Sequence, residues 1–86
     1  MKITLTSAKS ITRNHFDKEC KPYGLATFEI RSGVDIPEEG VWELICNVRC
    51  YESLVMREMI VRIDHEDGTI QAVKEINRHS ILKQEK

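Results

Sequence analysis

Apolar residues recur at every second position through most of residues 41–76. Successive side chains of an extended chain point to opposite faces of a sheet, so this period of two predicts β-strands with one apolar side. The apolar positions are Trp42, Leu44, Cys46, Val48 and Cys50 in the first segment and Met59, Val61 and Ile63 in the second. The dipeptide Asp67-Gly68 is a strong turn signal. After an even-numbered turn, Ile70 and Ala72 return to the apolar face as a third strand.

The register of the first two of these strands follows from parity, because facing residues of antiparallel strands lie on the same side of the sheet. A two-residue connection at Glu52-Ser53 predicts a defined set of partners. These are Trp42 with Ile63, Leu44 with Val61 and Cys46 with Met59 on the apolar side, and Glu43 with Arg62 on the other. A four-residue connection would instead place Arg49 opposite Glu58. Both alternatives keep the same residues in the core.

The N-terminal part of the chain is expected to form one strand and one helix. Residues 3–7 carry Ile3 and Leu5 at alternating positions, which predicts a first strand. Residues 10–20 have apolar residues at near-helical spacing and predict a short helix. Pro22 ends that helix, because proline disfavours a helical conformation in the residue before it.

The remaining segments add a strand, a loop and a second helix. Residues 25–31 alternate again and predict a strand, and residues 32–40, with two glycines and a proline, predict a loop. After Val73 the apolar spacing suits a helix better than a strand. A short terminal helix is therefore expected within residues 75–84.

Together these segments predict a single α+β domain over residues 1–86. Its antiparallel sheet has four to five strands in largely sequential (meander) order, with one or two short helices covering part of it. A chain of this size hides only about 60% of the surface that its unfolded form exposes, so association with another chain would stabilise it appreciably. The expected core residues are Leu5, Phe28, Ile30, Trp42, Leu44, Val48, Met59, Val61 and Ile63.

Charge and composition argue against several classes of protein. Thirteen basic and fourteen acidic residues give a net charge of -1, so the whole molecule lacks the basic character of a typical nucleic-acid binder. Hydrophobic residues make up 41% and charged residues 31%, as in an ordinary globular domain. No apolar run approaches the roughly 20 residues of a membrane span, and no membrane contact is expected.

The three cysteines, Cys20, Cys46 and Cys50, are expected to be free thiols. Their odd number and the lack of a signal peptide in the first residues favour a reducing, cytoplasmic location. On one strand Cys46 and Cys50 would lie roughly 13 Å apart, at ~3.3 Å per residue. That separation is too long for a disulfide or a shared zinc ion, so we expect buried thiols that pack as small hydrophobic residues.

No group of reactive residues stands out in the sequence. His65 is followed by Glu66 and Asp67, which together could bind a metal or move protons, but a solvated turn accounts for them better. His15 and His79 lie in no motif with a nucleophile, and no glycine-rich segment has the form of a phosphate-binding loop. We therefore expect no catalytic residue, no cofactor and no metal site.

The other side of the central hairpin carries more apolar residues than an exposed sheet should. These residues are Ile45, Tyr51, Met56 and Ile60. Two alternatives explain what would cover these residues. One is a helix of this chain, from residues 10–20 or from the C-terminus, and the other is a second copy of the chain. Under the second alternative the four residues form an interaction surface.

One short part of the chain resembles a known family. The strand Val61-Arg62-Ile63-Asp64, the turn Asp67-Gly68 and the returning Thr69-Ile70 are similar to the closing hairpin of PepSY-type small α+β domains. Domains of that type begin with a helix, whereas residues 3–7 of this chain predict a strand. No function is carried over from the resemblance.

The function predicted from these patterns is that of a small non-catalytic protein-interaction module, cytoplasmic and able to form a homodimer through its apolar sheet face. The alternative is a nucleic-acid-associated protein with a local basic surface, on which Tyr51 would stack against bases. That surface would comprise Arg49, Arg57, Arg62, Lys74 and Arg78. An enzyme built around His65 or a reactive Cys20 is the least favoured reading.

Overall fold

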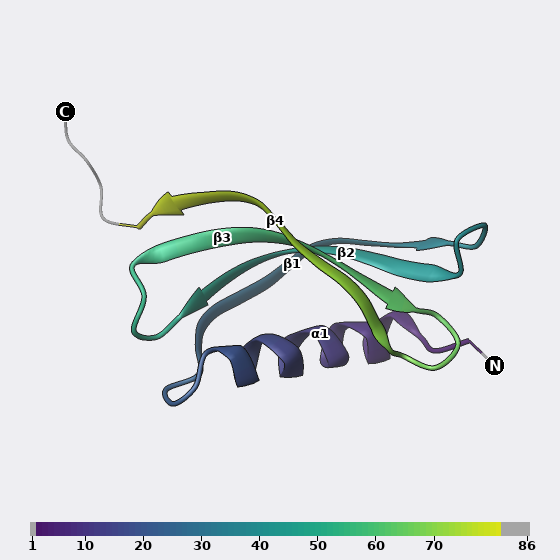
Figure 1. Ribbon diagram of the computed structural model, residues 1–86, viewed down its shortest axis with the longest axis horizontal. Coiled ribbons are helices and arrows are strands. Elements are labelled where there is room, and N and C mark those ends of the chain that lie inside the picture. Colours follow the sequence, from purple (N-terminus) through teal and green to yellow (C-terminus); the bar gives the residue numbers. More distant parts are fainter. Residues whose placement is uncertain (1, 82–86) are drawn as a thin grey trace.

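The computed structural model describes residues 2–81 and shows one helix packed on one antiparallel sheet (Figure 1). The elements are α1 (Leu5–Glu19), β1 (Leu25–Ile36), β2 (Val41–Cys50), β3 (Val55–Asp64) and β4 (Ile70–Ser80). The strands follow one another across the sheet in the order β1-β2-β3-β4. The prediction of an α+β fold with a meander sheet is therefore confirmed.

The register of β2 and β3 is the one expected for the two-residue connection. Trp42 lies opposite Ile63, Leu44 opposite Val61, Cys46 opposite Met59, and Glu43 opposite Arg62. Asn47, and not Arg49, faces Glu58, which rules out the four-residue alternative. A slip of one residue would turn every apolar side chain to the other face, so the alternating pattern determines the register strongly.

The core lies between α1 and the face of the sheet that carries Leu44, Cys46 and Val48, which we call the inner face. Residues from the helix and the two central strands are buried there. They are Ala8, Phe16, Leu44, Cys46, Val48, Met59, Val61 and Ile63. Of the other expected core residues, Phe28, Ile30 and Trp42 are partly buried against this cluster, and Leu5 is half-buried on the helix. Each fully buried large side chain contributes about 1.5–3 kcal/mol relative to an exposed one.

The prediction of a strand over residues 3–7 is wrong, because the helix begins at Leu5. Thr4 caps it: its side-chain oxygen accepts a hydrogen bond of 3.1 Å from the backbone N–H of Ser7. Ala8, Thr12 and Phe16 then follow at intervals of four and form the buried stripe of α1. The predicted helix over residues 10–20 is confirmed as part of this longer one. A capping side chain and a helical stripe outweigh the β-propensity of a few branched residues.

Strand β1 extends through residues that were expected to form a loop. It includes residues 32–36, with irregular register after Leu25 and at Arg31. Gly33 accounts for the difference: a Cβ atom added there would lie 2.7 Å from Cδ1 of Leu5. This glycine allows a close approach between the strand and the helix and does not mark a turn.

The expected terminal helix is also wrong for residues 75–80, which belong to β4; residues 82–84 of that prediction lie outside the described part of the chain. Gln71 and Ile76 are extra residues at two irregularities in the β3–β4 pairing. Each inserted residue turns a spacing of two into one of three, which imitates a helix in the sequence. The inserted Gln71 also moves Ala72 off the apolar face. Val73 takes its place on that face, opposite Val61.

Cys20 and Cys50 form a disulfide, with their Cα atoms 5.1 Å apart. The expectation of free thiols is therefore wrong for these two residues. Cys20 caps the C-terminus of α1, and the pairing of Leu25 with Cys50 brings the end of β2 beside it. Cys46 remains a free thiol in the core, where burial raises its pKa to about 12. This supports the expectation that Cys46 packs as a small hydrophobic residue.

Candidate functional site

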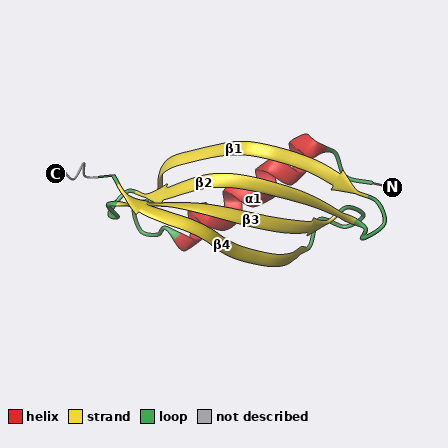
Figure 2. Cartoon of the chain, turned by 90° about the horizontal axis from the view of Figure 1, so that it is seen from above, coloured by secondary structure: helices red, strands yellow, loops and turns green. Residues whose placement is uncertain are grey.

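The face of the sheet opposite α1 is the first candidate site, and we call it the outer face. Figure 2 views the molecule from this side, with the four strands in front and α1 behind them. Ile45 and Ile60 lie opposite one another on β2 and β3, and both are partly exposed, as is Met56. Helix α1 packs on the inner face. Within residues 2–81 no other element covers the outer face, so helical cover from within that range is wrong.

Charged residues surround this apolar centre, and four of them form two ion pairs, Arg62 with Glu43 and Arg31 with Glu58. Arg62 donates a hydrogen bond of 3.0 Å to Glu43 and also pairs with Glu39, and these contacts raise the pKa of Arg62. Arg31 and Glu58 approach within 3.7 Å. Acidic and basic side chains are equal in number on this face. The acids are Glu29, Glu43, Glu58 and Asp64, and the bases are Arg31, Arg49, Arg62 and Lys74.

Tyr51 does not lie with the other three residues of the expected surface. It belongs to the turn after β2, at the end of the molecule that also contains the disulfide. There Tyr23, Tyr51 and Glu52 line a surface hollow of about 380 Å³. Sequence reasoning missed this hollow, because Tyr23 and Tyr51 are far apart in the chain and no local pattern joins them.

The five basic residues of the nucleic-acid alternative do not form one surface. Arg49, Arg62 and Lys74 lie on the outer face. Arg57 and Arg78 lie opposite one another on β3 and β4, on the inner face. Most of them also have acidic partners. Arg57 lies 3.7 Å from Glu19, and Arg78 donates two hydrogen bonds to Glu75. The guanidinium of Arg49 donates to the backbone oxygen of Ser53.

His65 lies in the expected turn after β3, where Glu66 and Asp67 are exposed, but its own side chain is held against the structure and is not solvated. Its side chain is only 14% exposed, and its Nδ1 lies 3.1 Å from a carboxylate oxygen of Asp35 on β1. Lys2 pairs with the other oxygen of Asp35 at 2.5 Å. The contacts of Lys2 and His65 hold the pKa of Asp35 below its usual range.

Backbone hydrogen bonds add to the cluster of Lys2, Asp35 and His65 and join the segment before α1 to the sheet. The N–H of Ile3 donates to the carbonyl oxygen of His65 at 2.7 Å, and the indole N–H of Trp42 donates to the carbonyl oxygen of Ile3 at 3.0 Å. The cluster therefore fixes the segment before α1 to the sheet.

The other residues singled out for chemistry are separated in the structure. His15 lies on α1 with its Nε2 3.5 Å from Glu19, and His79 lies opposite Met56 on the outer face. Cys20 is bonded to Cys50 and offers no thiolate nucleophile. Within residues 2–81 no three His, Cys, Asp or Glu side chains are placed to hold a metal ion. Over the same range, no helix has the length and apolar content needed to cross a membrane.

Comparison of the chain with protein-family models, with curated proteins and with solved structures found no match. Helix α1 removes the one difference noted above from PepSY-type domains, which begin with a helix. The resemblance of the hairpin nevertheless receives no support from a family model, and it assigns neither a family nor a function.

Proposed function

We propose that the protein is a small non-catalytic interaction module that self-associates through its outer face. The observation that supports this best is the cross-strand pair of Ile45 and Ile60 at the centre of that face. Both side chains are partly exposed, Met56 adds to the same apolar area, and no element of residues 2–81 lies over them. Apolar surface that an antiparallel sheet leaves toward water is typical of an interaction site.

The charges of the outer face favour a second copy of the chain as the partner. With four acids and four bases, two such faces would meet without net repulsion. Because Arg62 already binds Glu43 and Glu39, and Arg31 lies near Glu58, these charges keep their partners when water is excluded. Two sheets can stack face to face about 10 Å apart, as in a β-sandwich. A small core gains much from such added burial.

The disulfide bears on the location of this module. Disulfides persist in oxidising compartments and are rare in the cytosol. The Cys20–Cys50 bond therefore favours an oxidising compartment over the cytoplasmic location that the sequence suggested. Location stays a prediction, and the state of these cysteines in protein taken from its native source, alkylated before any reductant is added, tests it.

Sedimentation velocity tests the self-association directly. The protein should form dimers as its concentration rises from the low to the high micromolar range. Ile60→Glu should shift it to monomer, since a carboxylate would enter the interface, while Lys74 opposite it would still provide a partner in the folded monomer.

Leu54→Glu is the matched control, because Leu54 is an exposed leucine in the connection between β2 and β3, outside the four strands. This variant should still dimerise. A strictly monomeric wild-type protein at high micromolar concentration would remove self-association from the proposal. Dimers that survive Ile60→Glu would show that another surface is used.

Nucleic-acid binding is not favoured by any observation on the structure. The five basic residues lie on two faces, and Arg57, Arg62 and Arg78 are paired with carboxylates. Titration with oligonucleotides at low and moderate salt decides this alternative, since phosphate contacts give binding that weakens steeply with salt.

A further inference from the structure

The hollow between Tyr23 and Tyr51 has a chemical character that the outer face lacks. Its volume is about 380 Å³, near the low end of the roughly 300–1,000 Å³ range of small-ligand sites. It is lined by Tyr23, Tyr51 and Glu52, residues that carry two aromatic rings and one carboxylate. A space of this size suits one side chain or a small organic ion.

All three lining side chains are available to a ligand. Tyr23 is 70% and Tyr51 is 66% exposed, more than any other large hydrophobic residue of the described chain. Within residues 2–81 neither phenol group nor the carboxylate of Glu52 has a hydrogen-bond or ion-pair partner. These three side chains can therefore contact a ligand without losing a hydrogen bond or ion pair within residues 2–81.

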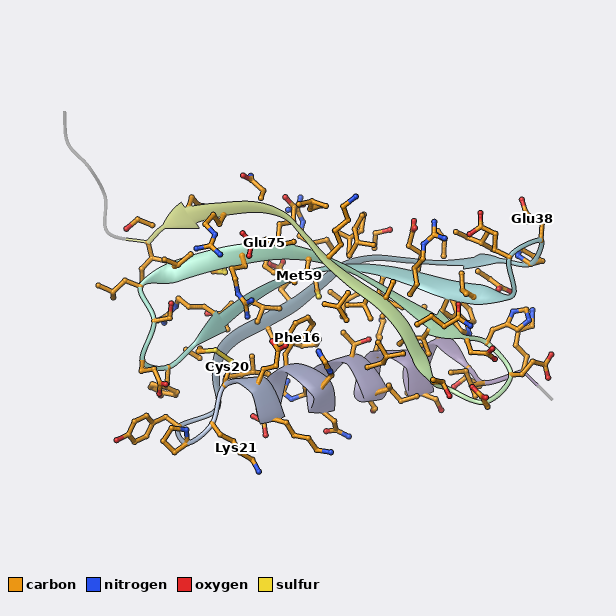
Figure 3. The ribbon with its side chains drawn as sticks, in the orientation of Figure 1. Phe16, Cys20, Lys21, Glu38, Met59 and Glu75 are labelled. Atoms are coloured by element: carbon orange, nitrogen blue, oxygen red, sulfur yellow. A yellow bond between two sulfur atoms is a disulfide. The ribbon has the colours of Figure 1, made fainter. Side chains whose placement is uncertain are left out.

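The two loops that present these side chains are tied together beneath them. Cys20 and Cys50 precede them in sequence and are joined by the disulfide, which Figure 3 shows at this end of the molecule. The N–H of Tyr51 donates to the carbonyl oxygen of Gly24 at 3.0 Å, and the N–H of Gly24 donates to that of Cys20 at 2.9 Å. The loops are therefore held in place before any ligand arrives, which lowers the entropy lost on binding.

From this geometry we propose that Tyr23, Tyr51 and Glu52 form a cation-binding notch, and that its ligand is the guanidinium group of an arginine on a peptide. The faces of tyrosine rings attract cations, and a carboxylate binds a guanidinium through two parallel hydrogen bonds. Arginine suits this set better than lysine, because its planar group can stack on a ring while its N–H groups reach a carboxylate. No covalent step is involved.

The basic residues nearby do not fill this role themselves. Arg49 is engaged with the carbonyl oxygen of Ser53, and Lys21 points away from the sheet in Figure 3. The notch lies at the end of the sheet and not on its outer face, so its function does not depend on self-association. Failure of either proposal leaves the other intact.

Titration followed by NMR tests the notch with a defined probe, N-acetyl-arginine methylamide, taken into the millimolar range. The signals of Tyr23, Tyr51 and Glu52 should shift in a saturable way. The matched probe is N-acetyl-citrulline methylamide, which keeps the planar shape and loses the charge. It should bind at least about fivefold more weakly, since a cation–π contact and an ion pair together contribute on that order at an exposed site.

Variants distinguish recognition of the cation from non-specific binding to the tyrosine rings. Glu52→Gln should weaken arginine binding about fivefold while leaving citrulline binding unchanged, because only the charge is removed. Tyr51→Leu should weaken both probes, with the fold checked from the backbone spectrum. Glu38→Gln is the matched control, since Glu38 is an exposed carboxylate in the turn at the opposite end of the molecule (Figure 3), and it should change nothing.

Three results would overturn the proposal. One is the absence of any saturable shift at the three residues. Another is equal affinity for arginine and citrulline, which would mean that the rings bind apolar or planar groups without regard to charge. The third is a set of shifts that maps to the acidic residues of the outer face. A loss of arginine binding in Glu38→Gln as large as the loss in Glu52→Gln would count in the same way.

Discussion

The Nδ1 atom of His65 lies 3.1 Å from Oδ1 of Asp35, across a separation of 30 residues. Lys2 approaches the other oxygen of the same carboxylate, so three segments of the chain meet at one side chain. The contact joins β1, the turn after β3 and the segment before α1. Asp35 is therefore one carboxylate through which pH should act on this end of the fold.

The first prediction concerns acid stability. The pKa of Asp35 is held below its usual value of 3.8, chiefly by the hydrogen bonds of Lys2 and then of His65. A folded-state pKa below the unfolded one gives stability that is complete above the unfolded value and is lost as pH falls through the folded value. The free energy of unfolding, measured in urea, should therefore fall below about pH 4.

Asp35→Asn removes this part of the pH dependence and should flatten the fall. Asp64 and Glu75 also have lowered pKa values, from backbone hydrogen bonds and from Arg78 respectively, so some slope will remain. Glu38→Gln serves as the control, since its carboxylate makes no hydrogen bond or ion pair within residues 2–81. If Asp35→Asn and Glu38→Gln gave the same pH profile, the contacts of Asp35 would carry no stability.

A second prediction concerns the Cys20–Cys50 disulfide, which closes a loop with a sequence separation of 30. In the chain-entropy account, a crosslink of this span stabilises the folded protein by about 3–4 kcal/mol, because it restricts the unfolded chain. Denaturant unfolding with and without reductant should show a loss of that size. A Cys46→Ala variant should lose as much on reduction, because Cys46 takes no part in the bond. Identical curves with and without reductant would count against the bond.

Cys46 itself should be inert in the folded protein. It is fully buried, and burial raises the pKa of its thiol to about 12, so almost no thiolate is present near neutral pH. Alkylation with iodoacetamide at pH 8 should label native protein very slowly, and should label one thiol per chain once the protein is unfolded without reductant. Rapid labelling of the native protein would indicate that the core opens or that Cys46 is exposed.

The helix start at Thr4 provides another test. Thr4→Ala removes the oxygen that accepts the N–H of Ser7 and should reduce the free energy of unfolding by about 1 kcal/mol. Thr6→Ala is the matched control, because Thr6 is an exposed helical residue and alanine has the higher helix propensity, so no loss is expected. Equal effects in the two variants would be inconsistent with Thr4 as the cap.

Some of the fold could be predicted because the relevant signals are local. The alternation in β2 and β3 determined their faces and their register, since moving Leu44 or Val61 by one position would expose it to water. The helix over residues 10–20 was found but its start was missed. Leu5 and Ile3 fit a strand pattern as well as a helical one, and the cap at Thr4 had to decide between them.

The candidate sites were predictable only where their residues are related by a local pattern. Ile45, Met56 and Ile60 share a face because of strand parity, which the sequence contains. Tyr51 was assigned to that face, but the turn carries it to the end of the molecule beside Tyr23. The neighbours of His65 were expected within its own turn, whereas its main partner, Asp35, comes from β1.

The sequence by itself determined the antiparallel hairpin, its apolar side and the central core, because these depend on spacing between neighbouring residues. Only the tertiary structure decided the partner of Cys20, the pairing of His65 with Asp35 and the strand in residues 75–80. Each of these depends on groups that are distant in the chain or on an inserted residue that changes the apolar period. Long-range pairing is set by the packing of whole elements, and a local pattern cannot encode it.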